Sequence, residues 1–320
     1  NGKLTITRCK FIRITNKADD GCALLCDVNY LIESTIEECE FIDCGRTFGK
    51  STLFTLSHRQ SSINFFCCNF KFTEAIGNCN VLELRSNGAL FDNCQFVKCG
   101  NNSIHITKNE MDEFPFGSFQ FTNNNIASIS AGIFINARRL RSNFSIRNNI
   151  FTNVTINSGN YFIYILHNQS EIELYNNTFY HINTTGNVGS NSGGIATFIE
   201  NTDSEFRFKI TECKFDDFIN QNQSGGVFQY KSDLNVHIEF KKCEFKHNKA
   251  KHHGGAISIR TSKSIEIINC IFESNFANSN EDDGKYLLFT NYDDNKEKGF
   301  GGAIFLTPSF NLKNKNYNMS

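Results

Sequence analysis

The stretch of sequence that decides the fold is residues 236–257, VHIEFKKCEFKHNKAKHHGGAI. An alternating apolar run (Val236, Ile238, Phe240) leads into Cys-Glu-Phe at 243–245, and Gly-Gly-Ala-Ile follows at 254–257. Alternation with a period of two predicts β-strands, and no apolar stripe of helical period and length occurs in the chain. The glycine pair predicts a tight turn. The stretch therefore predicts a unit of about three short strands separated by bends.

The centre of this unit, a Cys or Asn followed two residues later by Phe, recurs along the whole chain. The copies are Cys9/Phe11, Cys39/Phe41, Cys68/Phe70, Cys94/Phe96, a degenerate Phe119/Phe121, Asn149/Phe151, Asn177/Phe179, Cys213/Phe215, Cys243/Phe245 and Cys270/Phe272. Successive Phe residues are 30, 29, 26, 25, 30, 28, 36, 30 and 27 positions apart. A unit of about 29 residues cannot bury its own apolar face, so such units stack and share a continuous core. The sequence therefore predicts an all-β fold, a parallel β-helix solenoid of about ten to eleven coils.

Stacking in register predicts where each recurring residue lies. The Phe of each coil should face inward above the Phe of the previous coil, about 4.8 Å away. The Cys or Asn two residues earlier shares that strand face and should also point inward. Cys is suitable there as a small buried group and Asn because stacked amides hydrogen-bond along the ladder. The glycine pairs, which should allow close backbone approach at a turn, are Gly254, Gly255, Gly301 and Gly302.

Two motifs carry a resemblance to a known family. Gly-Gly-Ala-Ile occurs at 254–257 and 301–304, and Phe-x-x-Asn occurs at 121–124, 245–248 and 272–275. Together they resemble the repeats of polymorphic outer membrane proteins, and the chain is similar more broadly to the pectin-lyase-like superfamily of right-handed parallel β-helices. The resemblance implies a right-handed, surface-displayed rod used for adhesion or interaction. A cell-surface or extracellular location is part of that implication.

Composition and the chain ends narrow the class of protein. Lys and Arg number 32 against 33 Asp and Glu, and a net charge of −1 lacks the basic excess typical of nucleic-acid-binding proteins. No uninterrupted apolar stretch approaches the roughly 20 residues that a membrane-spanning helix needs. The chain begins at Asn1 without a signal peptide, and both ends look like cuts through a longer chain. We expect one solenoid domain over residues 1–320, truncated at both ends, with any membrane anchor elsewhere in the full chain.

The 13 cysteines admit two interpretations. Residues stacked about 4.8 Å apart meet the Cα separation of a disulfide, but their parallel side chains lack its usual geometry. Buried free thiols are therefore favoured over disulfides. A metal centre is disfavoured because the sequence has no Cys-x-x-Cys pair. His247, His252 and His253 have no acidic or Cys partner at zinc-like spacing, so we expect neither a metal nor another cofactor.

Acidic residues bear on whether the rod is an enzyme. Polysaccharide-active β-helices need clustered carboxylates, which bind Ca²⁺ beside a base or act as an acid pair. Here the acidic residues are scattered, and the weak calcium candidates are Asp282 and Asp283, in a loop insertion at about 280–299. Asp216 and Asp217 directly follow a core Phe. We therefore assign no catalytic residue, and a carbohydrate-active enzyme is the alternative.

Recognition is expected on the outside of the rod. Loops at 108–117 and 184–192 should project from it, and Tyr161, Phe162 and Tyr164 alternate between strand faces, so that a large ring faces outward. Basic residues at 138–141 and 241–253 are expected to form solvated faces, with contact to anionic glycans as the alternative. The sequence therefore predicts a non-catalytic interaction module whose partner is a protein or a glycan. A structural spacer is a second alternative.

Overall fold

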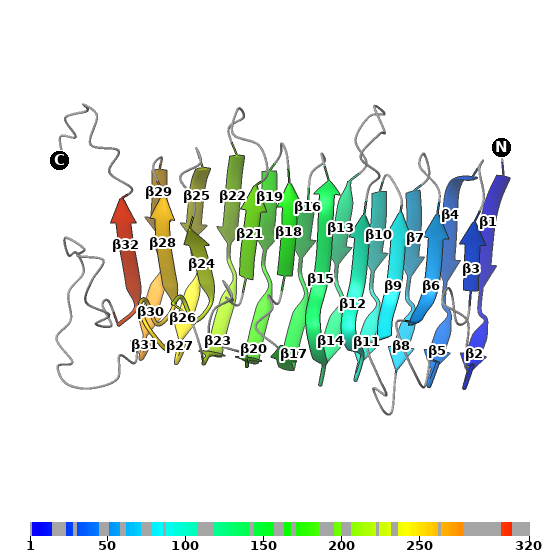
Figure 1. Cartoon of the computed structure of the whole chain (residues 1–320), viewed down its shortest axis with the longest axis horizontal. Helices are drawn as coiled ribbons and strands as arrows, with labels where there is room; N and C mark the ends of the chain where they lie inside the picture. Colours follow the sequence, from blue (N-terminus) through cyan, green and yellow to red (C-terminus); the bar gives the residue numbers. More distant parts are fainter. Residues whose placement is uncertain are drawn as a thin grey trace.

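The structure, a computed structural model, is an elongated stack of parallel strands (Figure 1). It describes residues 2–14, 24–27, 31–44, 51–57, 62–71, 79–85, 88–107, 118–140, 144–156, 163–167, 171–185, 195–199, 206–221, 224–231, 236–261, 264–277 and 302–308. Within these residues the chain forms strands and no helix, and the strands pair in parallel with their counterparts in the next coil. The predicted all-β parallel solenoid is confirmed.

The described strands form three ladders, and the chain visits the ladders in turn. The first ladder is a sheet of ten strands: β1 (Gly2–Thr7), β4 (Leu31–Glu37), β7 (Ser62–Phe66), β10 (Gly88–Asp92), β13 (Phe119–Thr122), β16 (Phe144–Arg147), β19 (Glu171–Tyr175), β22 (Phe206–Thr211), β25 (Val236–Lys241) and β29 (Ser264–Ile268). The second ladder comprises β2 (Lys10–Ile12), β5 (Glu40–Ile42), β8 (Asn69–Lys71), β11 (Gln95–Val97), β14 (Asn125–Ala127), β17 (Ile150–Ile156), β20 (Thr178–Thr184), β23 (Lys214–Asn220), β26 (Glu244–Lys246), β27 (Lys249–Ala250), β30 (Ile271–Glu273) and β31 (Phe276–Ala277). The third comprises β3 (Leu24–Asp27), β6 (Ser51–Ser57), β9 (Cys79–Arg85), β12 (Gly100–Thr107), β15 (Ser130–Leu140), β18 (Ile163–His167), β21 (Ile195–Ile199), β24 (Phe228–Lys231), β28 (Ile257–Thr261) and β32 (Ile304–Pro308).

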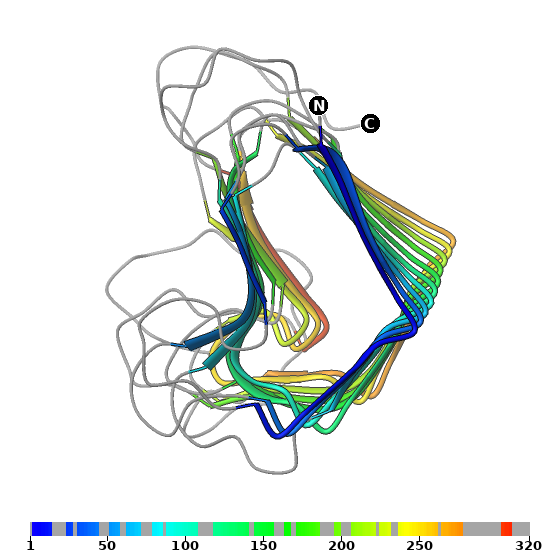
Figure 2. The ribbon, with the colours of Figure 1, turned by 90° about the vertical axis from the view of Figure 1, so that its right-hand side faces the viewer.

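The coil is right-handed. Figure 2 looks along the rod from its N-terminal end, with the first ladder on the right, the second ladder at the bottom and the third ladder on the left. The chain runs down the first ladder and returns up the third, clockwise, while it recedes from the viewer (Figures 1 and 2). A clockwise path that recedes is a right-handed superhelix, as is usual for crossovers between parallel strands.

Two bends in each coil depend on single residues in the left-handed backbone conformation. The first bend separates the first ladder from the second, and the second bend ends the short second-ladder strand. The described chain holds 19 non-glycine residues at these bends, with φ between 50° and 57°. At the first bends from Arg8 to Lys242 this residue's N–H donates to a carbonyl of the next coil, as Asn148 does to Tyr175 at 3.0 Å. The next residue consequently points inward.

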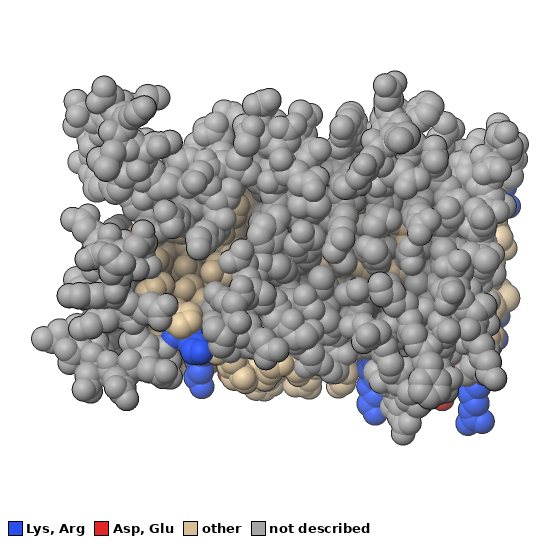
Figure 3. Space-filling view, viewed as in Figure 1, with Lys and Arg blue, Asp and Glu red and all other residues tan. Residues whose placement is uncertain are grey.

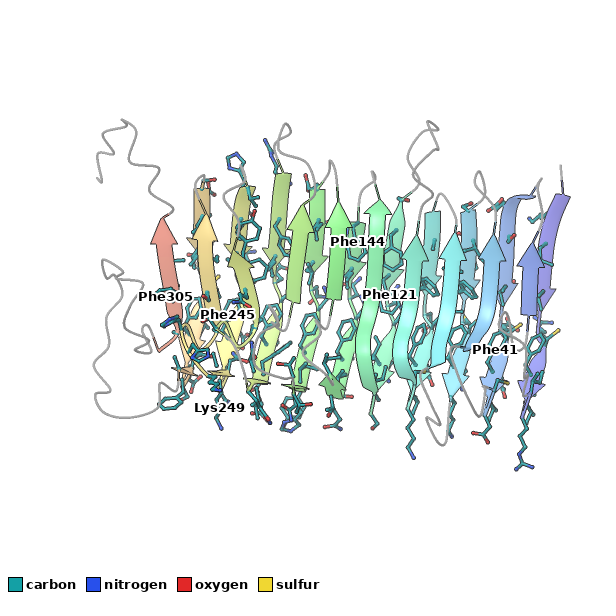
Figure 4. The ribbon with its side chains drawn as sticks, viewed as in Figure 1. Phe41, Phe121, Phe144, Phe245, Lys249 and Phe305 are labelled. Atoms are coloured by element: carbon teal, nitrogen blue, oxygen red, sulfur yellow. The ribbon has the colours of Figure 1, made fainter. Side chains whose placement is uncertain are left out.

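Phenylalanine rings fill the interior in columns. Along the second ladder, ring centroids of successive coils lie 4.6–5.1 Å apart in nearly parallel stacks, in the runs Phe11–Phe41–Phe70–Phe96 and Phe151–Phe179–Phe215–Phe245–Phe272. The rings labelled Phe41 and Phe245 in Figure 4 belong to these runs. Rings from Phe41 to Phe245 are fully buried. Stacking in this geometry contributes beyond the area that each ring buries.

Phe119/Phe121, predicted as a degenerate copy of the repeat, does not lie on the ladder of the other copies. Phe119 and Phe121 lie on the first ladder, where Phe121 pairs with Phe91 and not with Phe96. The second-ladder position of this coil belongs to Ile126, which pairs with Phe96 and Phe151. The Phe121 ring compensates for the missing ring because its centroid lies 5.7 Å from that of Phe96 and 6.3 Å from that of Phe151. An inward ring from a neighbouring strand thus produced the same spacing in sequence.

The residue after the first bend is Cys in some coils and Asn in others, and both side chains make the same hydrogen bond. The thiol of Cys68 donates to the carbonyl of Ile36 at 3.3 Å, and Nδ2 of Asn149 donates to that of Phe121 at 2.7 Å. In each case the acceptor belongs to the preceding coil. Described members of this column are Cys9, Cys39, Cys68, Cys94, Asn124, Asn149, Asn177, Cys213, Cys243 and Cys270, and its seven members from Cys39 to Cys213 are almost fully buried.

Copies of the Phe-x-x-Asn motif occur at two structurally different positions in the coil. Asn248 and Asn275 follow the second bend, and Nδ2 of Asn248 donates to Oδ1 of Asn275 at 2.8 Å. Asn124 follows the first bend instead, in the column with Asn149. The copy at 121–124 is therefore not equivalent to the other two. Cys44 and Cys99 occupy the second-bend position in earlier coils, and both are buried.

The glycine pair at 254–255 forms the tight turn before β28. Gly254 has a φ of 58°, and a Cβ on Gly255 would lie 2.3 Å from the carbonyl oxygen of Gly302. Gly302 is the described member of the second pair, and Gly301 lies outside the described residues. The pair therefore permits coils to approach more closely than any side chain would allow.

Candidate functional site

The outward side chains of the rod form straight rows, with one residue from each coil. At the first bend, four consecutive coils contribute exposed asparagines, Asn93, Asn123, Asn148 and Asn176, which we call the Asn ridge. The carboxamides of the last three form a chain of hydrogen bonds, whereas Nδ2 of Asn93 donates to Sγ of Cys67 at 3.4 Å. Nδ2 of Asn176 donates to Oδ1 of Asn148 at 2.9 Å, Asn148 donates to Asn123 at 3.3 Å, and Asn123 donates to Oδ1 of Asp92 at 2.8 Å. The ridge is therefore an ordered surface feature.

A second row lies beside the ridge, on the outer face of the second ladder. Over the same coils it presents Gln95, Asn125, Ile150 and Thr178, which pair in register. Ile150 is 50% exposed. In the coil before Asn93, the two positions are Cys67 and Asn69. The ten residues of these five coils include no charged side chain, and we call them the uncharged strip.

Ion pairs bound the uncharged strip at both ends. On the N-terminal side, Nε of Arg8 lies 2.6 Å from Oε2 of Glu38, and Lys10 pairs with Glu40 at 3.1 Å. On the C-terminal side, Nζ of Lys242 lies 3.2 Å from Oε1 of Glu212, and Lys214 approaches Glu244 at 3.9 Å. Each pair joins two residues of the same row in successive coils. Beyond both ends of the strip, the two rows therefore carry alternating positive and negative side chains.

Backbone preference alone does not explain the Asn ridge. Asn adopts the left-handed conformation more readily than most residues, which favours it at such bends. The second bend has the same range of φ values, yet its described residues are Arg13, Asp43, Lys98, Ser128, Asn153, His181, Asp217, His247 and Ser274. Only one of these is Asn. The run of asparagines at the first bend therefore follows from the side-chain chain of hydrogen bonds as well.

A second outward feature lies at the second bend of later coils. Nδ1 of His181 contacts Oδ2 of Asp217, and Nδ1 of His247 lies 2.9 Å from Oδ1 of Asp216. The ring of Tyr180, 41% exposed, lies against that of His181, with centroids 3.7 Å apart. These five residues, which we call the His–Asp cluster, combine an aromatic surface with two imidazole–carboxylate pairs.

The second-ladder side of the C-terminal coils carries basic residues. Lys249 points outward at the lower edge of the rod (Figure 4), and Figure 3 shows basic side chains gathered at that edge. Lys246 lies 3.2 Å from Glu244 and 3.6 Å from Glu273. The acidic neighbours thus offset part of the basic charge of residues 241–253.

A hydrogen-bonded network shifts the pKa values of two groups on the first-ladder side. The hydroxyl of Tyr175 donates to Oε2 of Glu212 at 2.9 Å. This bond, with the neighbouring Lys242 ammonium, lowers the pKa of Glu212. The same contact raises the pKa of Tyr175, because ionisation would place two negative charges together. The network joins the last coil of the uncharged strip, through Tyr175, to the two coils that follow it.

None of the ten cysteines whose side chains the structure describes forms a disulfide: Cys9, Cys39, Cys44, Cys67, Cys68, Cys94, Cys99, Cys213, Cys243 and Cys270. Burial raises the pKa of Cys213 to about 12 and that of Cys39 above its usual range. The pKa of Cys270 is lowered to about 7, mainly by its hydrogen bond with Cys243. Cys213 and Cys39 are therefore protonated core residues at neutral pH.

Several predicted features lie outside the described residues. They are the calcium candidates Asp282 and Asp283, the insertion at 280–299, the loop at 108–117, residues 186–192 of the other loop, Tyr161, Phe162 and Arg141. Sequence reasoning did not identify the Asn ridge, although the doublets Asn123-Asn124, Asn148-Asn149 and Asn176-Asn177 were a usable signal. In each doublet the first residue faces outward and the second inward.

Within the described ranges, no group of three or more His, Cys, Asp or Glu side chains is arranged to hold a metal ion. The same part of the chain offers no helix with the length and apolarity to cross a membrane. Comparisons with protein-family models, curated proteins and solved structures find no match. The rows of outward side chains are thus the basis for a functional proposal.

Proposed function

We propose that this chain is a non-catalytic interaction module, displayed at a cell surface or secreted, which binds a protein or glycan through its outward rows. The observation that carries the proposal is the alignment of outward side chains into rows, one residue per coil, on a hydrogen-bonded stack. A rigid support of this kind lowers the entropy cost of binding an extended ligand. Adhesion through repeated weak contacts would follow from the same arrangement.

Membership of the pectin-lyase-like superfamily, and likeness to polymorphic membrane protein repeats, belong to this proposal. They are supported by the right-handed parallel coil and by the turn that Gly254 and Gly255 form before β28. The Phe-x-x-Asn motif supports the likeness at Asn248 and Asn275, which stack after the second bend.

A glycan-array binding screen combined with a turnover assay, with and without Ca²⁺, tests the proposal. Binding without product formation is the expected result. Product formation would overturn the non-catalytic proposal. Absence of binding to glycans, followed by absence of binding to proteins from a cell-surface extract, would leave a spacer and would also overturn it.

A carbohydrate-active enzyme is the second candidate, and the His–Asp cluster is the observation that favours it. A histidine whose Nδ1 contacts a carboxylate can present Nε2 to a substrate as a general base. His181 and His247 both have this contact, and Tyr180 lies beside His181. Turnover that disappears in His181→Ala and His247→Ala variants, with binding retained, would establish this candidate instead.

A further inference from the structure

The uncharged strip differs from the coils that flank it, where ion pairs join successive coils at the same two positions. We infer that the strip binds a neutral, extended polysaccharide that lies parallel to the rod axis. The inference rests on the proposed function and names the ligand class and the site. The strip is on the convex corner at the right of Figure 2, where the first and second ladders meet.

Hydrogen-bonding capacity at the ridge matches a polyhydroxylated ligand. A carboxamide has two N–H donors and an oxygen with two lone pairs. Asn148 uses one N–H on Asn123, and its oxygen accepts one bond from Asn176. One donor and one lone pair of this exposed side chain thus remain for a ligand. Sugar hydroxyls, which donate and accept at once, complement such a pair of groups.

The spacing of the ridge suits a repeating ligand. Successive coils place equivalent groups about 4.8 Å apart, and the five coils of the strip span about 20 Å. Successive sugar units of an extended β-1,4-linked polysaccharide lie at a similar distance but face alternate ways, so each coil can meet one unit and every second coil meets the same face. Because the amides already bond to one another, binding does not have to immobilise them.

The chemistry beside the ridge favours a neutral chain over a charged one. Ile150, half exposed next to Asn148 in the same coil, offers apolar contact to the C–H face of a sugar ring. Within the strip no side chain supplies a countercharge for a uronate or sulfate group. On the opposite flank of the ridge, Asp92 accepts from Asn123 and Arg147 pairs with Glu173, so each of these three charged groups already has a partner.

The test compares two glycine variants that preserve the left-handed backbone. Asn123→Gly/Asn148→Gly removes two central amides of the ridge, and glycine tolerates their positive φ. Asn153→Gly is the matched control, because Asn153 is an exposed asparagine with φ of 53° at the second bend of the same coil as Asn148. Thermal unfolding and circular dichroism should show that both variants fold.

Binding is measured to immobilised β-linked gluco- and chito-oligosaccharides of increasing length, and to polygalacturonate and heparin as anionic probes. We expect affinity for the neutral series to rise until the chain spans the strip, about 20 Å. The double variant should weaken that affinity about tenfold or more, since at least two hydrogen bonds are lost, while the control variant changes it less than twofold.

Three outcomes would overturn the inference. Neutral binding that the double variant leaves unchanged, but that Tyr180→Ala removes, would move the site to the His–Asp cluster and leave the proposed function intact. Salt-sensitive binding to the anionic probes alone would contradict the neutral ligand class. Absence of binding to any glycan, with capture of a protein partner by the wild-type chain, would contradict the inference while supporting the wider interaction role.

Discussion

Asn149 and Asn177 occupy the same inward position on successive coils, and Nδ2 of Asn149 donates to Oδ1 of Asn177 at 2.9 Å. The oxygen of Asn149 in turn accepts from the backbone N–H of Asn124 at 2.8 Å and from its Nδ2 at 3.0 Å. Each amide oxygen therefore accepts a hydrogen bond from the backbone N–H at the bend of the coil before it. Where Cys replaces Asn, as at Cys270, the backbone N–H of Cys243 meets a sulfur atom at 3.4 Å. Sulfur is the weaker acceptor.

Replacing Asn149 tests how much this inward row stabilises the rod. Asn149→Ala removes the hydrogen bond to the carbonyl of Phe121 and takes an acceptor from the backbone N–H and Nδ2 of Asn124, so we expect the free energy of unfolding to fall by about 2 to 4 kcal/mol. Asn149→Cys should cost about half as much, because a thiol still donates to Phe121. Urea denaturation measures both. Equal losses in the two variants would contradict the equivalence of Cys and Asn at this position.

The buried thiol of Cys213 should lower the free energy of unfolding at alkaline pH. Burial raises its pKa from 9.0 to about 12, so the folded chain holds a proton that the unfolded chain releases above pH 9. Stability from this group is therefore complete below pH 9 and is lost as the pH rises toward 12. The loss is at most about 1.4 kcal/mol per pH unit for one thiol.

Cys213→Asn should remove this contribution and extend the row of amides from Asn177. The measurement is the difference in unfolding free energy between wild type and variant across the alkaline range. We expect the variant to gain relative to wild type as the pH rises above 9. Parallel pH profiles would show that ionisation of Cys213 does not limit stability.

The fold was predictable because the period-two runs and the Cys/Asn-x-Phe spacing report directly on strands and on stacking. The register of one coil was not predictable in this way. Phe119 and Phe121 alternate as an inward pair on the first ladder, and their spacing to the next Phe imitates that of a second-ladder copy. Sequence spacing locates a ring in the interior but does not say from which ladder it comes.

Ile126 offers a test of the corrected register. Because the Phe121 ring lies between Phe96 and Phe151, Ile126→Phe should overfill the core and cost about 1 to 3 kcal/mol. Adding Phe121→Leu should recover most of that loss by freeing the space for a second-ladder ring. A double-mutant cycle on unfolding free energy measures the coupling. Additive losses would show that the two side chains do not compete for the same volume.

The outer site was harder to predict than the core. Core positions repeat because each must bury an apolar group, whereas outward residues are free to vary from coil to coil. The doublet Asn148-Asn149 shows the difficulty, since both residues form hydrogen-bonded rows but only the left-handed bend between the ladders determines which one faces outward. The His–Asp cluster joins residues from three coils, 36 and 31 positions apart in sequence, and no local motif marks it.

Gly255 tests how closely the C-terminal coils approach. A Cβ at this position would lie 2.3 Å from the oxygen of Gly302 and 2.4 Å from the nitrogen of Phe276, both of them backbone atoms of neighbouring segments. Gly255→Ala should therefore separate β28 from β32 and cost about 3 kcal/mol or more. Ala256→Gly, one residue along, removes a buried methyl and should cost about 1 kcal/mol.

Amide hydrogen exchange is the suitable measurement for Gly255, because a solenoid can open locally while its other coils stay folded. We expect Gly255→Ala to accelerate exchange in β28 and β32 and to leave β16 and β19 protected. The Ala256→Gly control should change exchange in β28 far less. Equal exchange rates in β28 for the two variants would contradict this expectation. The hydrogen bond from the N–H of Gly255 to the carbonyl of Gly302, 2.9 Å long, would then tolerate a side chain, and glycine would be required at this position only for the turn.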